Sequence, residues 1–204
     1  STWVQKGNDI NGEAAGDQSG LNVSISDDGN YVASGAPYNS SGGSNSGHVK
    51  IYRWNGSDWG GEGYEWEIVG QASSNFGFTN SLNQDGSRIL IGGTGYSSNK
   101  GIVEVHQLSE GTWSKLGSSL IGTTSGDQFG KWAQISGNGN IIAVGAPEAD
   151  ESGTDRGYVK VYEWNSSSNT WDQKGSTFIG ETDSDKLGDR FGLSLSLNGL
   201  VLAI

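Results

Sequence analysis

The chain lacks several residue types, and each absence excludes a class of protein. Its 204 residues include no cysteine, no methionine and only two prolines. Without cysteine, neither a disulfide scaffold nor a cysteine-based zinc site is available. Basic residues are few, because 12 Lys and Arg stand against 23 Asp and Glu, for a net charge of −11. This excess of acid indicates no nucleic-acid partner, which would require a basic face. No apolar run reaches membrane-spanning length, so no membrane insertion is expected.

Glycine and tryptophan are abundant by contrast, with 35 and 8 residues. Hydrophobic residues make up only 32% of the chain, so the large aromatic side chains have to supply much of the buried apolar area. Frequent glycine with regularly spaced aromatics is typical of short strands joined by tight turns. The composition therefore predicts an all-β protein.

Short motifs recur along the chain, which indicates a repeat protein. One is a Trp followed four residues later by Gly, at Trp3, Trp66, Trp113 and Trp171. A Gly-Asp-x-x-Gly motif follows at 16–20, 126–130 and 188–192, and the second repeat lacks its Asp. An Asp-Gly or Asn-Gly pair comes next, at 28–29, 85–86, 138–139 and 198–199. Such pairs predict hairpins with type I′ turns, in which both central residues have positive φ.

Each repeat predicts four strands that follow one another as a meander, which is the blade of a β-propeller. The repeats span about 1–59, 60–108 and 109–164, and an incomplete fourth spans 165–204. The predicted fold is an all-β propeller of four-stranded antiparallel blades. Residues 200–204 read as a buried strand without its following strand, so we expect the segment to be part of a longer, seven-bladed propeller.

Phe129-Gly130, Gly145-Ala146-Pro147 and Phe191-Gly192 resemble the FG-GAP repeat of integrin α-subunit propellers. The wider pattern resembles FG-GAP arrays in large secreted or surface proteins of marine bacteria and microalgae. The resemblance implies a propeller at the cell surface or outside the cell. The integrin-type repeat carries an Asp-x-Asp-x-Asp-Gly calcium loop, which is reduced here to forms such as Ser26-Asp27-Asp28-Gly29. The family's calcium function is therefore not transferred to these hairpins.

Two acidic loops are expected on one rim of the propeller. The first contains Glu148, Asp150, Glu151 and Asp155, which we take as candidate ligand-binding residues. The second contains Glu181, Asp183, Asp185 and Asp189, which have the composition of a Ca²⁺ site. A solvated acidic rim is the alternative interpretation of both. The motifs require no cofactor, and Ca²⁺ is the one ion that these loops suggest.

The remaining conspicuous residues divide between structure and function. Repetition assigns the four motif tryptophans to blade packing, and Asp17, Asp127 and Asp189 to hydrogen bonds within turns. Trp132 has no aromatic counterpart in the other repeats, so it is a candidate ligand contact. His48 and His106 are not clustered in the sequence and predict no metal site. Asn39, Asn55 and Asn165 lie in Asn-x-Ser/Thr sequons, which would be N-glycosylated in a secreted eukaryotic protein.

For function, the pattern favours an extracellular or cell-surface adhesion module that binds a glycan or a protein through its rim loops. One alternative is a structural building block of an extracellular assembly, whose partners would be further blades or subunits. Another is a propeller glycosidase or lyase. Nothing in the sequence positions a catalytic pair of carboxylates, so we expect no enzymatic activity.

Overall fold

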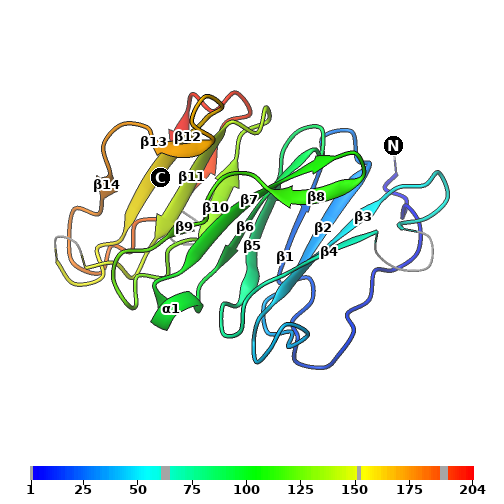
Figure 1. Ribbon diagram of the computed structural model, residues 1–204, viewed down its shortest axis with the longest axis horizontal. Coiled ribbons are helices and arrows are strands. Elements are labelled where there is room, and N and C mark those ends of the chain that lie inside the picture. Colours follow the sequence, from blue (N-terminus) through cyan, green and yellow to red (C-terminus); the bar gives the residue numbers. More distant parts are fainter. Residues whose placement is uncertain (1, 61–64, 151–152, 189–192) are drawn as a thin grey trace.

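The computed structural model describes residues 2–60, 65–150, 153–188 and 193–204. These residues form antiparallel sheets that follow one another along the chain, from right to left in Figure 1. The first blade consists of β1 (Asn22–Ile25), β2 (Tyr31–Ala36), β3 (His48–Arg53) and β4 (Trp66–Val69). In each blade, consecutive strands pair with one another in chain order. The predicted fold class of four-stranded antiparallel blades is confirmed.

The second and third blades repeat this arrangement, except that their fourth strand has two pieces. The second blade consists of β5 (Phe76–Leu82), β6 (Arg88–Gly93), β7 (Ile102–Ser109), β8 (Thr112–Lys115) and β9 (Leu120–Ile121). The third consists of β10 (Trp132–Ile135), β11 (Ile141–Ala146), β12 (Tyr158–Asn165), β13 (Thr170–Gln173) and β14 (Phe178–Ile179). Of the fourth repeat, the described part forms a hairpin of β15 (Ser194–Leu195) and β16 (Leu202–Ala203). The short element α1 (Tyr96–Asn99) is a tight turn with positive φ at Ser97 and Ser98.

The same hydrogen bond closes the hairpin between the first two strands in all four repeats. A side-chain oxygen before the turn accepts a hydrogen bond from the backbone N–H five residues later. The pairs are Ser26 with Tyr31 (3.0 Å), Asn83 with Arg88 (2.8 Å), Ser136 with Ile141 (3.0 Å) and Ser196 with Val201 (2.9 Å). Positive φ occurs only at the glycine of each Asp-Gly or Asn-Gly pair. The hairpins are therefore confirmed, but the type I′ geometry is wrong, because the residue before the glycine keeps a negative φ.

Close glycine contacts explain another repeated motif. A Cβ atom added to Gly35, Gly92 or Gly145 would lie 2.1, 2.2 or 2.4 Å from a carbonyl oxygen of the next blade. These oxygens belong to Gly77, Gly130 and Gly188. The second strand of each blade thus touches the backbone of its neighbour, and any side chain would separate the two.

The register of two repeats differs from the predicted alignment. Leu187 pairs with Gly157 as Phe129 pairs with Gly101, so Gly188 takes the position of Gly130. The motif ending at Gly192 is therefore not the structural equivalent, and Asp185 replaces Asp189 as the counterpart of Asp127. Asp189, Phe191 and Gly192 themselves lie outside the described residues.

In the first blade, Gly70 donates a backbone hydrogen bond to Gly47, as Gly122 does to Gly101. Val69-Gly70 therefore occupies the place in the first blade that Ile121-Gly122 has in the second.

The tryptophans are also reassigned. Trp59 pairs with Trp54 as Trp171 pairs with Trp164, so Trp59 is the counterpart of Trp171. Trp66 pairs instead with Ile51. Its ring stacks on Tyr31 and meets Trp113 edge to face, so it still packs between blades. The expectation for Trp3 is wrong, because its side chain is fully exposed at 103%.

The first strands of neighbouring blades are joined by one recurring bond. A side-chain oxygen accepts from a backbone N–H of the next blade, in Ser24 with Leu82 (3.1 Å), Ser81 with Ile135 (3.4 Å) and Gln134 with Leu195 (2.6 Å). The far side of β1 is open. Ile25 is 59% exposed there, whereas its equivalents Leu82 and Ile135 are 8% and 7% exposed.

Candidate functional site

A cavity lies across the first strands β1, β5 and β10, which carry the bonds between blades. Its volume is about 260 Å³. The lining residues are Asn22, Val23, Ser24, Thr79, Asn80, Ser81, Trp132, Ala133, Gln134 and Leu193. None of these side chains carries a charge. The candidate ligand contact Trp132 therefore lies in a neutral cavity lined by amide and hydroxyl groups.

Two hydrogen bonds and one aromatic contact hold the walls of this cavity in place. Asn80 donates from Nδ2 to the Asn22 carbonyl (2.9 Å) and accepts from the Ser24 hydroxyl (2.6 Å). The Trp132 ring meets Phe78 edge to face, with centroids 6.3 Å apart. Phe78 lies at a register shift in β5, between Phe76 and Thr79, and no other described strand pair shows such a shift. An aromatic side chain is thus fixed beside rigid amides, which suits a flat, hydroxyl-rich ligand.

The two acidic rim loops do come together, as expected, and they do so through ion pairs. Lys186 bonds to Glu148 and lies 3.6 Å from Asp155, while Lys131 lies 3.1 Å from Glu148. Burial raises the pKa of Glu148, but the hydrogen bonds from Lys186 and Lys131 outweigh it and the pKa is lowered. Asp150 accepts a bond from the Asp155 backbone N–H (2.7 Å).

The members of the second loop bind neighbouring groups in the same way. Asp183 lies 2.9 Å from the Arg156 guanidinium. Asp185 accepts from the Thr182 N–H (2.7 Å) and hydroxyl (2.6 Å). Asp127 likewise accepts from the Thr124 N–H (3.1 Å), and the hydroxyl near it is that of Thr123 (3.4 Å). Glu181 is exposed. Glu151 and Asp189 lie outside the described residues. In the described part of these loops, Glu148, Asp155 and Asp183 lie against lysine or arginine, whereas Asp150 and Asp185 accept hydrogen bonds from nearby backbone or hydroxyl groups.

The sequon residues differ in exposure. Asn39 is 7% exposed, and its amide donates to Asp17 (2.7 Å). The expectation of a modifiable Asn39 is therefore wrong, because its amide nitrogen is already used in the interior. Asn55 is exposed, and Asn165 is half-buried with its amide on Asp172 (2.9 Å).

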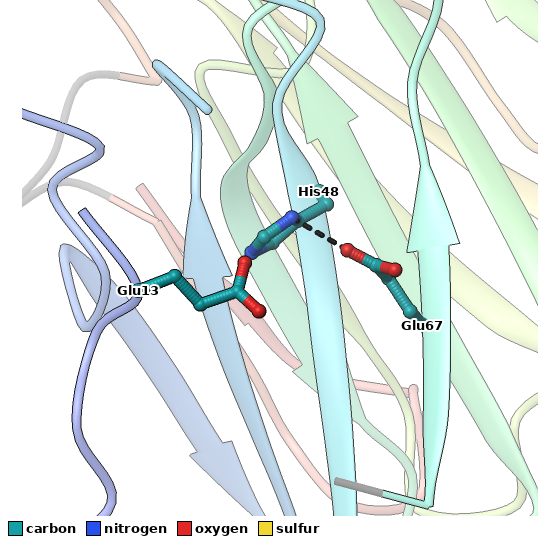
Figure 2. Close-up of side chains that lie close together, drawn as sticks. All are labelled: Glu13, His48 and Glu67. Carbon is teal, nitrogen blue, oxygen red and sulfur yellow. Dashed lines mark ion pairs between the residues drawn. The ribbon is translucent and has the colours of Figure 1, made fainter. Parts of the chain in front are cut away.

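A further cluster was not anticipated from the sequence. Glu13, His48 and Glu67 offer ligand atoms that lie within 4.8 Å of one another. His48 comes from β3, Glu67 from β4 and Glu13 from the segment before β1, and Figure 2 shows the imidazole between the two carboxylates. His48 Nδ1 lies 2.8 Å from Glu67 Oε1, and Lys50 bonds to Glu13. Burial lowers the pKa of His48, although Glu67 acts in the opposite direction.

This cluster was missed because its residue types are not repeated, since Ile102 and Tyr158 stand where His48 does in the other blades. Glu67 comes to lie beside His48 because it pairs with Lys50 on the adjacent strand. A sequence alignment that matches Trp66 with Trp171 implies a different register, in which this pairing does not occur. Glu13 lies 35 positions before His48, so nothing local links them. The expectation that the histidines are unclustered is wrong for His48.

The second blade has its own buried polar network, at the position of Lys50. Glu104 accepts from Ser119 (2.6 Å) and contacts His106 (3.0 Å) and Lys115 (3.3 Å). Burial raises the pKa of Glu104, but the hydrogen bonds from His106 and Ser119 and the charge of Lys115 outweigh it. The resulting pKa is about 2, against 4.5 for an ordinary Glu.

The lowered pKa of Glu104 predicts a pH dependence of stability. A depressed carboxylate pKa contributes stability above the unfolded value of 4.5, and this is lost as pH falls towards 2. The contribution is on the order of 3 kcal/mol at neutral pH. We expect Glu104→Gln to lower the free energy of unfolding by up to this amount at pH 7, measured by urea denaturation, and the difference from wild type to vanish near pH 2. Glu163→Gln, which removes an exposed partner of Lys174, is the control. Parallel pH curves for wild type and Glu104→Gln would contradict the expectation.

The comparisons with known proteins bear on the fold alone. No protein-family model matches the chain, and neither does any curated protein. Among solved structures it is similar to Saccharomyces cerevisiae Sqt1, with a TM-score of 0.56, 15% identity, and 88% of this chain covering 40% of that one. It is also similar to a proposed 6-phosphogluconolactonase from Bacteroides uniformis, with a TM-score of 0.56 and 12% identity; the match covers 89% of this chain and 45% of that one. A second proposed 6-phosphogluconolactonase, from Bacteroides fragilis, has a TM-score of 0.55 and 14% identity, and the match covers 88% of this chain and 45% of that one. The fold is therefore β-propeller-like, and the chain spans less than half the length of these structures.

These similarities correct one expectation. We expected no enzymatic activity, yet two proteins of this fold are proposed 6-phosphogluconolactonases. Because one fold supports many unrelated functions, a propeller gives no ground for excluding catalysis. In the described part of the chain, no helix is long and apolar enough to span a membrane.

Proposed function

We propose that the chain is part of an FG-GAP-type propeller at the cell surface or outside the cell, and that it recognises a glycan. The proposed binding site is the cavity on β1, β5 and β10 rather than the rim loops. The observation that supports it is the place of Trp132, an aromatic side chain among amides and hydroxyls in a cavity of about 260 Å³.

The chemistry of the lining favours a neutral sugar over other ligands. An aromatic face packs against the apolar C–H face of a pyranose, and amide and hydroxyl groups match its hydroxyls. The lining offers no charge to compensate a phosphate or an ammonium group. The carboxylates of Glu148, Asp155 and Asp183 in the rim loops, in contrast, lie against lysine or arginine within the chain, which leaves them poorly suited to recognise a ligand.

A glycan array followed by calorimetry tests this function. We expect a neutral oligosaccharide to bind, and Trp132→Ala to weaken binding about tenfold, because an aromatic face contributes about 1.5 kcal/mol. Trp132→Phe should retain most of the affinity. Trp3→Ala, which removes a fully exposed ring elsewhere, should bind like the wild type. The proposal fails if no glycan binds, or if Trp132→Ala binds as tightly as wild type while remaining folded.

A further inference from the structure

The cluster of Glu13, His48 and Glu67 places two carboxylates around one buried imidazole. The side chains of His48 and Lys50 are 3% and 7% exposed, that of Glu67 is 23% exposed and that of Glu13 is 52% exposed. Lys50 bonds to Glu13, and Glu67 lies against the other side of the imidazole. Two carboxylates can compensate the charge of a divalent cation bound between them and the imidazole.

The imidazole supplies a second, independent observation. His48 Nδ1 is buried and forms no hydrogen bond, although Glu67 Oε1 lies only 2.8 Å away. The contact is short but is not aligned as a hydrogen bond, so this buried nitrogen is available as a ligand. Two ligand atoms each roughly 2.0–2.2 Å from a tetrahedral ion lie roughly 3.3–3.6 Å apart, so a small movement of Glu67 would place the pair at that distance.

We propose that Glu13, His48 and Glu67 bind a divalent transition-metal ion, with Zn²⁺ as the reference ion. One imidazole nitrogen and two carboxylate oxygens are ligands that Zn²⁺ accepts. Ca²⁺ and Mg²⁺ are disfavoured, since they prefer oxygen ligands alone. Three protein ligands leave a fourth position for water or an external ligand. Lys50, bonded to Glu13, then orients that carboxylate from outside the ligand set.

The bound ion would fasten one part of the chain to another. Glu13 belongs to a segment without strands, and its side chain is 52% exposed. His48 and Glu67 belong to adjacent strands of the first blade, paired through β3 and β4. The metal would therefore stabilise the contact between this segment and the first blade.

Titration of chelator-treated protein with Zn²⁺, followed by calorimetry, tests the site. We expect one equivalent to bind, and Glu13→Gln, His48→Gln and Glu67→Gln each to weaken binding roughly tenfold or more. Co²⁺ should give visible d–d absorption that these variants lose. His48 is buried, so His48→Gln could weaken Zn²⁺ binding by disturbing the fold. Glu13 is largely exposed, so Glu13→Gln should leave the fold intact and tests the loss of a ligand alone.

The chain supplies a matched control in its second histidine. His106 also lies beside a glutamate, but its Nε2 contacts Glu104 with hydrogen-bond geometry, and Ser119 and Lys115 complete that network. His106→Gln should therefore bind Zn²⁺ like wild type. Lys50→Met tests the alternative that the Lys50 ammonium group occupies the place of a metal ion beside Glu13. In that case only the variant, and not the wild type, would bind Zn²⁺. If wild type binds no Zn²⁺ and only Lys50→Met does, or if His48→Gln and Glu13→Gln bind as wild type does, the proposal is overturned.

Discussion

Gly92→Ala is expected to destabilise the protein by about 4 kcal/mol or more, which leaves little folded protein at 25 °C. The added Cβ would lie 2.2 Å from the Gly130 carbonyl oxygen and 2.6 Å from Thr79 Cγ2. The carbonyl oxygen belongs to the backbone of the next blade, so it cannot yield without moving a strand. The measurement is the free energy of unfolding from urea denaturation monitored by tryptophan fluorescence.

Gly111→Ala is the matched control for this substitution. Its added Cβ meets no atom within 4 Å, and its φ of +77° is the only source of strain. We expect it to cost about 1 kcal/mol, the usual penalty for a side chain in the left-handed region. Equal effects of the two substitutions would show that contact between the blades is not what selects glycine at position 92.

Phe129→Ala is expected to cost about 4 kcal/mol, the usual range for removing a fully buried phenylalanine. Phe129 is 2% exposed, and its ring meets those of Tyr158 and Tyr162 at centroid distances of 6.3 and 6.4 Å. Removing the ring leaves a cavity between two blades and abolishes both aromatic contacts. The loss would appear as a lower urea midpoint with an unchanged slope.

The fourth repeat provides the control for this prediction as well. Leu187 occupies the position equivalent to Phe129, since each pairs with the glycine before the third strand of its neighbouring sheet. Phe129→Leu should therefore cost only about 1 kcal/mol. If leucine proves as damaging as alanine, the two positions are not equivalent and the reassigned register of the fourth repeat is wrong.

The fold was predictable from sequence because its rules are local and repeated. In each repeat an Asp-Gly or Asn-Gly pair places the hairpin between the first two strands, and alternating residues assign the strands on either side. The register between the third and fourth strands was harder to predict. It depends on how many residues fit in the connecting loop, and two tryptophans after Trp54, Trp59 and Trp66, are both candidates for the position opposite it.

The candidate sites were predictable only in part. Trp132 was found because it breaks a repeat, and the structure places it in a cavity. The acidic loops were found by composition, which counts charges without showing their partners. Lys131 and Lys186 approach Glu148 from two other parts of the chain. Glu13 and His48 meet through the docking of a segment that has no strand pattern, and no local signal describes such docking.

The hydrogen bonds that join Ser24 to Leu82, Ser81 to Ile135 and Gln134 to Leu195 couple the unfolding of neighbouring blades. Among the described residues these bonds join each blade to the next one along the chain, so we expect the folding free energy to be close to a sum of blade terms and interface terms, as in a one-dimensional chain of coupled units. The second and third blades have such an interface on both sides. We therefore expect the amides of β6 and β11 to be among the last to exchange with solvent.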